Sequence, residues 1–450
     1  MSRSLEDPAV DVRPSRSSAR YVLGLLFLGN LLNFYDRALP AVVLEPIKND
    51  YGLDDTQVGI LASAFVVVAA LAGVPLGRLA DRIPRRTVAG WGLLGWSAFT
   101  AAGGLLTNFW GFLASRVGVG VGESSYAPAT GSLLADLYPA ERRSRANALF
   151  MLGFPIGTLL AFLTAGGLAE AFDTWRAPFL VAAVPGFVVA VLVLRIREPQ
   201  RGAAEPDPAA TDPAAADPAA AAPVARKGPL LKVLRIRSMY GLILAFAGYN
   251  FAAYAIGTFL TPVLQRYYGL DLVDAGAVGG VVIGVTGLIG LLAGGRVLDR
   301  AAKRSTAARV AVAAACLAGA AVFAFAGLSA GRGTLWQLVL FLSLSYLLGI
   351  IYLAAAVPAV ADVIRPAQRS GAIGLMSAIG YLLGGAGGPI VVGILSDALA
   401  AGATGAADAT AQGLQRAMMI AVPMAFTVAA AGMLLATRYV NTDRDTMLAG

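Results

Sequence analysis

The sequence GRLADRIPRR at residues 77–86 returns in the second half of the chain as GRVLDRAAKR at residues 295–304. Both copies begin with Gly, have Asp-Arg at the fifth and sixth positions, and end in two basic residues. A second correspondence follows each copy, because Asp136 and Asp362 both stand seven residues before an Arg-Ser pair. Internal repeats mark equivalent places in repeated structural units. The chain is therefore predicted to consist of two similar halves.

The composition of the chain is typical of a membrane protein. Of its 450 residues, 57% are hydrophobic and only 14% are charged, which is far more apolar than an average soluble domain. The net charge of +8 does not indicate nucleic-acid binding, because the Lys and Arg residues stand between apolar segments and form no single basic patch. We therefore expect a protein that crosses the lipid bilayer many times and binds no nucleic acid.

Cysteine and histidine are almost absent from the sequence. Cys316 is the single cysteine, which we interpret as a small buried hydrophobe, and there is no histidine. The chain thus lacks the commonest metal ligands, and we expect neither a metal nor another cofactor. A membrane enzyme is disfavoured for the same reason. Any proton chemistry must use Asp or Glu.

Apolar segments of about 20 residues, the length that crosses a bilayer, occur six times in each half. The first is longer than a signal-peptide core of about 7–15 residues and is expected to be retained. The Ala/Pro/Asp-rich stretch 203–223 predicts a flexible linker between the halves. The predicted organisation is a tail (1–20), a six-helix bundle (21–196), a linker (197–237), a six-helix bundle (238–438) and a second tail (439–450). The spans are predicted at 21–44, 57–78, 87–107, 109–135, 146–170, 175–195, 239–264, 275–298, 306–329, 334–361, 371–396 and 413–437.

Positively charged residues predict the orientation, because they stay on the cytoplasmic side of a membrane. If the N-terminus is inside, most of the 35 Lys and Arg residues fall in cytoplasmic tails, loops and the linker. Both termini are therefore predicted to be cytoplasmic. The exceptions are Arg37, Lys48, Arg116, Arg176, Arg266, Arg332 and Arg416.

Two six-span halves with GxxxDR and two further basic residues after spans two and eight resemble the major facilitator superfamily, with Pro84 where glycine is usual. The resemblance implies an all-helical fold of twelve spans whose two bundles rock about a midplane site. Three further stretches resemble its spinster branch, which implies a lipid-like substrate such as a lysophospholipid or a phosphorylated sphingoid base. These stretches are NFYDR at 33–37, RVGVGVGESS at 116–125, and ADLYP at 135–139 with Arg142-Arg143 behind it.

The repeated loops are candidates for a cytoplasmic gate. A short acidic side chain at a helix end can accept hydrogen bonds from the free N–H groups of a neighbouring helix N-terminus. Asp81 is thus expected to bind the start of span eleven, and Asp299 the start of span five. The resemblance implies that these contacts close the cytoplasmic side in the outward-open state. Alternatively the loops only fix the orientation of the protein in the membrane. Lys and Arg would suffice for that, so this alternative does not explain why Asp81 and Asp299 are present. The predicted gate is Asp81, Arg82, Arg85, Asp299 and Arg300.

Two spans carry charges within their apolar segments, and such residues are functional-site hypotheses by default. On span one, Asn30, Asn33, Asp36 and Arg37 fall within an arc of roughly 120°. On span four, Arg116, Glu123, Tyr126 and Thr130 fall within roughly 80°. From the helical rise, Asp36 and Arg116 lie about 13 and 10 Å below the outer boundary, and Glu123 about 21 Å.

The functional hypothesis for these charges is coupling of a substrate to protons. Asp36 or Glu123 carries the coupled proton, while Arg116 or Arg37 holds the substrate anion and exchanges partners when the proton arrives. The alternative is a static ion-pair network that joins spans one and four, although buried ion pairs contribute little net stability. Sodium coupling also stays open. The first question for a structure is whether Arg116 pairs with Asp36 or with Glu123.

The second half has no charge deep in its spans, and its candidate polar face is milder. Asn250, Tyr254, Thr258 and Thr261 follow helical spacing on span seven, and Tyr346 and Tyr352 lie on span ten. Each is as easily an interhelical hydrogen-bonding group as a ligand contact. A cavity with one charged wall and one largely apolar wall favours an amphipathic anion. The predicted substrate-binding residues are Arg116, Arg37, Asn33, Tyr126, Asn250, Tyr254 and Tyr352.

The function that these observations predict is secondary active transport of an amphipathic anion, coupled to protons, by a monomer in the cell membrane. For a prokaryote this is the inner membrane. The alternatives are transport of another small organic solute, such as a drug, sugar or organic acid, and a non-transporting sensor of the same fold. Flux measurements separate the sensor from the transporters.

Overall fold

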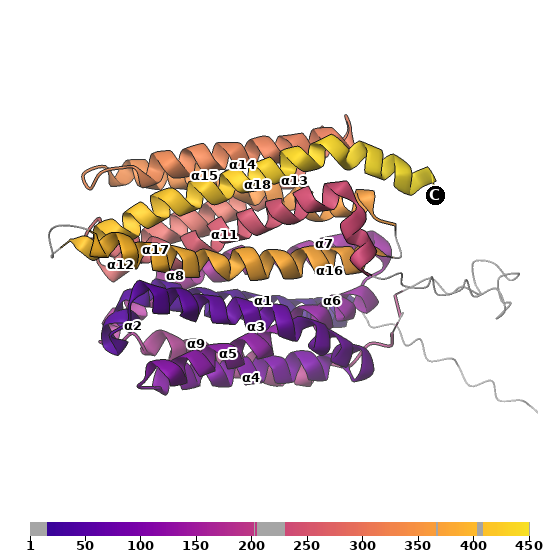
Figure 1. Cartoon of the computed structure of the whole chain (residues 1–450). Helices are drawn as coiled ribbons and strands as arrows, with labels where there is room; N and C mark the ends of the chain where they lie inside the picture. Colours follow the sequence, from indigo (N-terminus) through magenta and orange to yellow (C-terminus); the bar gives the residue numbers. More distant parts are fainter. Residues whose placement is uncertain (1–15, 202, 205–229, 366–367, 403–407, 450) are drawn as a thin grey trace, which may run out of the picture.

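The structure, a computed structural model, describes residues 16–201, 203–204, 230–365, 368–402 and 408–449, and within these ranges it is helical without any β-strand. Two groups of long helices lie side by side, one from each half of the sequence (Figure 1). Most of the predicted stretch 203–223, of the tail 1–20 and of the linker 197–237 lies outside the described residues.

The described residues of the first half form nine helices, and all except α2 overlap a predicted apolar segment; α2 lies between the first two segments. Span four is divided at Ser125 into α5 and α6, and span five is divided at Leu152 into α7 and α8. The helices are α1 (Arg16–Val42), α2 (Leu44–Tyr51), α3 (Asp55–Arg82), α4 (Arg85–Leu105), α5 (Phe109–Ser124), α6 (Tyr126–Leu137), α7 (Ala140–Met151), α8 (Gly153–Ala171) and α9 (Ala177–Leu194).

The second half continues the pattern after the short 3-10 helix η3 (Leu230–Arg235). Two of its spans contain a π-helical turn, which is a feature frequent at functional sites. The predicted C-terminal tail 439–450 continues the last helix as far as residue 449. The elements are α11 (Arg237–Arg266), α12 (Leu272–Gly279), η4 (Gly280–Val285), α13 (Thr286–Ala302), α14 (Thr306–Leu328), α15 (Leu335–Val363), α16 (Arg369–Gly380), η6 (Tyr381–Gly385), α17 (Gly387–Ala401) and α18 (Ala409–Ala449).

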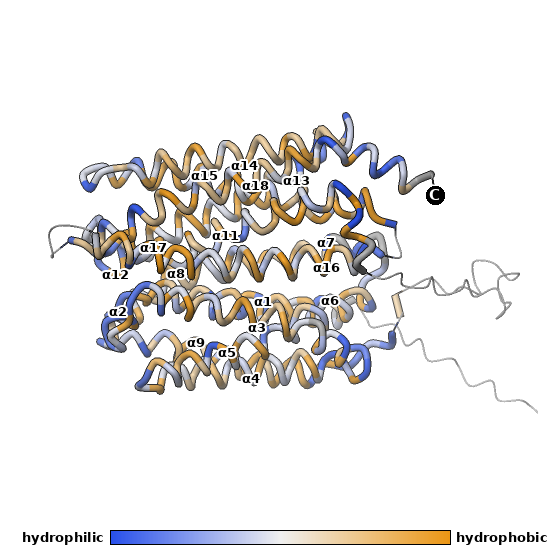
Figure 2. The backbone as a smooth tube through the Cα atoms, viewed as in Figure 1, coloured by the Kyte–Doolittle hydropathy of each residue, from blue (hydrophilic) through white to orange (hydrophobic). Residues whose placement is uncertain are grey.

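Nine helices or helix pairs among the described residues are long and apolar enough to cross a membrane. Hydrophobic residues cover the middle of the helices, and hydrophilic residues gather at their two ends (Figure 2). The predicted segments 21–44, 87–107 and 109–135 form α1, α4 and α5 with α6, which are not among the nine. The first and third of these segments carry the buried charges.

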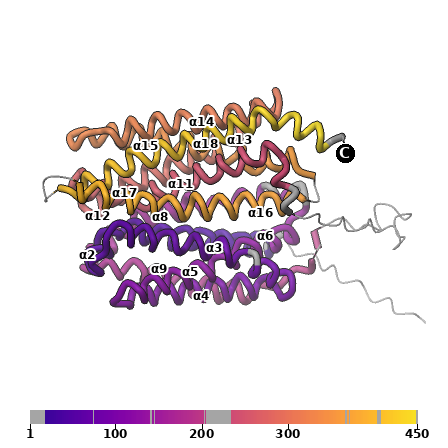
Figure 3. Tube along the Cα trace, viewed as in Figure 1, coloured from indigo at the N-terminus to yellow at the C-terminus, as the bar shows by residue number. Residues whose placement is uncertain are grey.

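The two ends of the molecule differ, and we name them by their contents. The "α2 end" contains α2 and α12, and the "terminus end" contains the start of α1 and the end of α18 (Figure 3). The halves meet where α3 packs against α17 and η6, where α8 packs against α12 and η4, and where α11 lies against α1 and α2.

The repeat seen in the sequence returns as a repeated ion pair. Arg85 at the start of α4 binds Asp136 at the end of α6, and Arg309 near the start of α14 binds Asp362 at the end of α15. Each pair connects the third and fourth spans of its half. The two aspartates identified by their common spacing therefore occupy equivalent positions in the fold.

Candidate functional site

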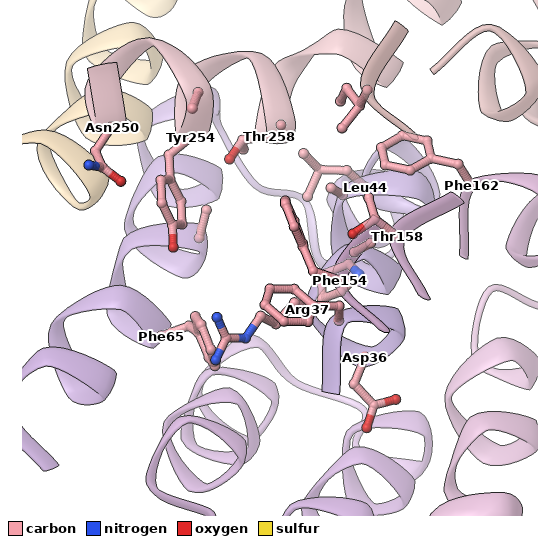
Figure 4. Close-up of a pocket in the computed structure, with 18 of the residues that line it drawn as sticks. Asp36, Arg37, Leu44, Phe65, Phe154, Thr158, Phe162, Asn250, Tyr254 and Thr258 are labelled. Carbon is pink, nitrogen blue, oxygen red and sulfur yellow. The ribbon is translucent and has the colours of Figure 1, made fainter. Parts of the chain in front are cut away.

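A cavity of about 410 Å³ lies between the two halves. Helices α1, α3, α5 and α8 of the first half and α11, α15 and the turns η4 and η6 of the second half form its wall. Figure 4 shows Arg37 in the middle of this lining, with Phe65 and Tyr254 on one side and Leu44 and Phe162 on the other. The charged residues of the wall, Asp36, Arg37 and Arg116, all come from the first half.

Arg37 forms the central ion pair of the site. Its Nε donates to Oε2 of Glu123 over 2.6 Å, so the pair links α1 to the end of α5. The guanidinium lies 4.9 Å from the ring centres of both Phe34 and Phe65, a range at which aromatic faces attract cations. The Arg37 side chain is 30% exposed and the Glu123 side chain is fully buried. Arg37 therefore lies on the cavity side of the ion pair, and Glu123 lies behind it.

Asp36 is buried behind the cavity wall at 2% exposure. Thr100 on α4 donates a hydrogen bond to Asp36 Oδ2 over 3.3 Å, while Oδ1 has no hydrogen-bond partner among the described residues. Its carboxylate points away from the centre of the cavity in Figure 4. A buried carboxylate with one free oxygen can take up a proton without breaking an ion pair.

Arg116 is 4% exposed and lines the cavity. Among the described residues it makes neither a salt bridge nor a hydrogen bond, and the ring of Phe179 lies 5.8 Å from its guanidinium carbon. The structure therefore answers the question about its partner: Arg116 pairs with neither Asp36 nor Glu123, because Glu123 is held by Arg37. The carboxylates of Asp36 and Glu123 act on Arg116 electrostatically without contacting it. A buried cation without direct hydrogen-bond partners is energetically costly, and an anionic ligand would offset that cost.

The second half contributes an aromatic wall. Asn250 and Tyr254 line the cavity as predicted from span seven, and Asn250 Nδ2 donates to the carbonyl of Phe246 over 2.7 Å. The sequence reasoning missed Tyr249 and Tyr381, which also line it. Tyr381 belongs to the π-helical turn η6, and its place in the glycine-rich stretch 380–389 was the signal that was available.

Three predicted binding residues lie outside the cavity lining. Asn33 is buried on α1. Tyr126 donates from its hydroxyl to the carbonyl of Leu26 over 3.0 Å and packs against Trp96 in the core of the first half. Tyr352 is fully buried against Tyr249, with ring centres 5.3 Å apart. Helical spacing placed these side chains on the correct arc, but the neighbouring helices cover them.

The predicted gate residues lie at the terminus end. Asp81, Arg82, Asp299 and Arg300 are exposed, and neither aspartate makes a hydrogen bond or ion pair with the residues that the structure describes. Arg85 differs from them, because it is 1% exposed and binds Asp136 and, over 2.8 Å, Glu198. Arg85 thus connects helices within the first half.

A polar network that the sequence reasoning did not predict joins the halves at the α2 end. Arg266 of α11 binds Glu45 and, over 2.8 Å, Asp55, and Lys48 also binds Asp55 over 2.5 Å. Asp397 of α17 accepts hydrogen bonds from the backbone N–H groups of residues 55 and 56 over 3.1 and 2.8 Å. An aspartate therefore does cap a neighbouring helix across the halves, but at the end opposite to the predicted gate.

The cavity combines cationic groups, buried carboxylates and a large apolar and aromatic surface. No group of His, Cys, Asp and Glu that could hold a metal ion occurs within the described ranges. The arrangement is suited to binding an anion next to an apolar group.

Comparisons with known proteins agree with this geometry. The Major Facilitator Superfamily pattern matches residues 26–389. The chain is 32% identical to an "MFS-type efflux pump" of Mycolicibacterium smegmatis, over 89% of this chain and 88% of that protein. It is 26% identical to "Sphingosine-1-phosphate transporter SPNS2" of Danio rerio, over 84% and 76% of the two chains.

A solved structure has the same fold over almost its whole length. It is a crystal structure of a bacterial homolog to the human lysosomal transporter spinster, in an inward-facing and unoccupied conformation. The TM-score is 0.83 at 25% identity, and the match covers 96% of this chain and 99% of that one. These relatives are transporters and efflux pumps, not enzymes, and the chain is accordingly a multi-pass membrane protein. It belongs to the Major Facilitator Superfamily, and within that superfamily it resembles the spinster proteins.

Proposed function

We propose that the protein is a secondary active transporter of an amphipathic anion, a lysophospholipid or a phosphorylated sphingoid base, and that protons drive it. The observation that carries the proposal is Arg116, a buried guanidinium that faces the cavity and has no partner among the described residues. An anion that binds there would gain a charge-assisted hydrogen bond in a site largely withdrawn from water.

The remainder of the cavity supports an amphipathic ligand. Apart from the three charged residues and a few amide and hydroxyl groups, its wall consists of aliphatic and aromatic side chains. A small inorganic anion would leave this surface without apolar contacts, whereas an aliphatic chain would cover it. Burial of a chain is worth roughly 0.8 kcal/mol for each methylene.

Two buried carboxylates are the candidates for proton coupling. Glu123 holds Arg37, and Asp36 has a free oxygen close to the cavity wall. When Glu123 takes up a proton, Arg37 loses its ionic partner and becomes available to the substrate anion. Proton binding and anion binding would then favour each other, which is the thermodynamic requirement for coupled transport.

The arrangement of the halves supports alternating access by two six-helix bundles, with twelve spans and both termini in the cytoplasm. The hydrogen bonds between the halves, among the described residues, lie at the α2 end or at Ser63 near the middle of α3. With the terminus end inside, this is an inward-open arrangement. Asp81 and Asp299 are exposed here, and we propose that they bind helix N-termini in the opposite state.

The relatives favour the lipid-like substrate and also supply a second candidate. The zebrafish relative is named a sphingosine-1-phosphate transporter. Sphingosine-1-phosphate is a phosphorylated sphingoid base. The mycobacterial relative is more similar and is named an efflux pump. Export of another small organic solute is therefore the second candidate function.

The test is a flux assay with purified protein in liposomes. Radiolabelled palmitoyl lysophosphatidic acid, sphingosine-1-phosphate and the soluble anion glycerol phosphate are compared, with and without an imposed pH gradient. We expect gradient-dependent flux of the two lipids and none of glycerol phosphate. Flux without any response to the gradient would contradict proton coupling. Flux of glycerol phosphate alone would contradict the amphipathic substrate, and the absence of all flux would favour the sensor.

A further inference from the structure

The cavity continues beyond Arg37 toward the α2 end, and this part is apolar. We call it the α2-end pouch. Four of its side chains are almost fully buried, with exposures between 2% for Leu44 and 6% for Ile283. The α2-end pouch is lined by Pro40, Ala41, Leu44, Leu61, Phe162 and Ile283.

Several helices independently place these residues on the α2 side of the charges. Helix α1 runs toward the α2 end, so Ala41 lies about 6 Å beyond Arg37 at 1.5 Å per residue, and Leu44 begins α2 just after α1 ends. Helix α8 runs the same way, and Phe162 follows Phe154 by two turns. Figure 4 shows Leu44, Phe162 and the flanking Thr158 together on one side of Arg37.

The opposite side of Arg37 is more polar. Asn250 and Tyr254 lie there in Figure 4, and the ring centre of Tyr381 lies 6.3 Å from that of Tyr254. The axis of the cavity therefore runs from a polar region at the terminus side, past the arginines, into an apolar region at the α2 end.

The α2-end pouch is closed at its far end. Leu61 follows Asp55 by six residues on α3, and Asp55 is 1% exposed, with Arg266, Lys48 and Ser396 bonded to its carboxylate. An aliphatic chain that enters the pouch from the terminus side passes the apolar residues first and then meets the charged groups around Asp55. The pouch is thus a dead end of limited length in this conformation.

We propose that the α2-end pouch binds the aliphatic chain of the substrate, with the chain end directed at the Asp55 network and the anionic group at Arg37 and Arg116. The inference rests on the proposed function and adds the orientation of the ligand and a limit on its chain length. The chain enters first from the terminus side, and the head group follows it to the arginines.

Photolabelling tests the orientation directly. The probe is palmitoyl lysophosphatidic acid with a diazirine at the end of its chain, added to the full-length protein and mapped by peptide mass spectrometry. Adducts are expected on Leu44, Phe162 or Ile283. Adducts on Tyr249 or Leu353 would overturn the proposal, as would labelling that unlabelled palmitoyl lysophosphatidic acid does not displace.

A matched pair of substitutions tests the limit on chain length. Ile283→Trp fills the α2-end pouch, whereas Ile289→Trp makes the same change on the next part of that span, where the side chain is 51% exposed. We expect Ile283→Trp to weaken binding of the palmitoyl lipid by roughly fourfold for each methylene excluded. Binding of the hexanoyl lipid should be unchanged, and Ile289→Trp should affect neither.

The outcomes separate this inference from the proposed function. An equal effect of Ile283→Trp on both chain lengths, or no effect on either, would overturn the pouch. Labelling in the pouch by a lipid that the wild-type protein does not transport would support the inference and contradict the transport function. If the wild-type protein transports the lipid but the label at the chain end reacts outside the α2-end pouch, the result would support the transport function and contradict the inference.

Discussion

Two arginines, Arg85 and Arg116, are almost fully buried in the same half of the molecule, with exposures of 1% and 4%. Arg85 binds two carboxylates and Arg116 binds none among the described residues. A structural arginine needs its partners, whereas a binding arginine is left available for a ligand. The contrast between the two makes the role of Arg116 testable with one substitution.

Arg85→Gln and Arg116→Gln are expected to have different effects. Arg85→Gln takes a buried cation away from Asp136 and from Glu198, whose side chain is 24% exposed, and should lower the free energy of unfolding by about 1–3 kcal/mol. Arg116→Gln removes a buried charge that makes no salt bridge or hydrogen bond within the described residues, so stability should fall less than in Arg85→Gln, while affinity for palmitoyl lysophosphatidic acid should fall about tenfold or more. Thermal unfolding and calorimetric titration measure the two quantities. Equal destabilisation by both substitutions would show that Arg116 is structural.

Glu123→Gln is the corresponding test for coupling. Glutamine keeps the size of the side chain but cannot exchange a proton, and it removes the ionic partner of Arg37. We expect uptake driven by an imposed pH gradient to be lost while the protein folds and still binds lipid. Glu170→Gln is the control, because Glu170 is exposed at the end of α8. Undiminished gradient-driven uptake would exclude Glu123 from the mechanism.

At the scale of elements, the crossing of α3 and α17 depends on close backbone contact. A Cβ at residue 393 would lie 2.2 Å from the carbonyl oxygen of Asp55, and a Cβ at residue 59 would lie 2.4 Å from that of Pro389. Only glycine allows this approach. The contact brings Asp397 to the first turn of α3.

Gly393→Ala is expected to separate α17 from α3 at this point. The N–H groups of Asp55 and Thr56 would then lose Asp397 as acceptor, and their hydrogen exchange should become faster. Gly387→Ala on the same helix is the control, because its Cβ would meet its nearest neighbour at 4.0 Å. Unchanged exchange in both variants would contradict a role for the close approach.

At the scale of the whole molecule, the network at the α2 end holds the two halves together in this conformation. Its members come from α2, α3, α11 and α17, and it is the most highly charged contact between the halves that the described residues make. In the alternating access that we propose, these contacts break when the cavity opens at the α2 end. Weakening them should therefore shift the balance between conformations.

Arg266→Gln is expected to increase the population that is open at the α2 end. Loss of charged hydrogen bonds worth about 1–3 kcal/mol changes the ratio of two conformations by roughly 5–150-fold. Spin labels at Ile60 and Ile394, with Cys316 replaced by Ser, would report a longer distance between α3 and α17. Arg332→Gln is the control, because Arg332 pairs with Asp408 inside the second half. An unchanged distance distribution would contradict the gating role.

The sequence by itself predicted the two-half organisation, the approximate positions of the long helices and the charges on spans one and four. These features follow from local patterns, because the length of an apolar segment and the helical period depend only on neighbouring residues. The positions of Asn250 and Tyr254 on the cavity wall were predictable for the same reason.

Only the tertiary structure decided which charges pair and which side chains reach the cavity. Arg37 binds Glu123 from another span, although helical depth placed Asp36 and Arg116 at about the same level and Glu123 deeper. Tyr126 has the right helical angle but lies behind Trp96. The α2-end network unites residues 45, 55, 266 and 397, which no local pattern connects. Pairing and exposure depend on how helices rotate and cross, and that is fixed by the packing of the whole molecule.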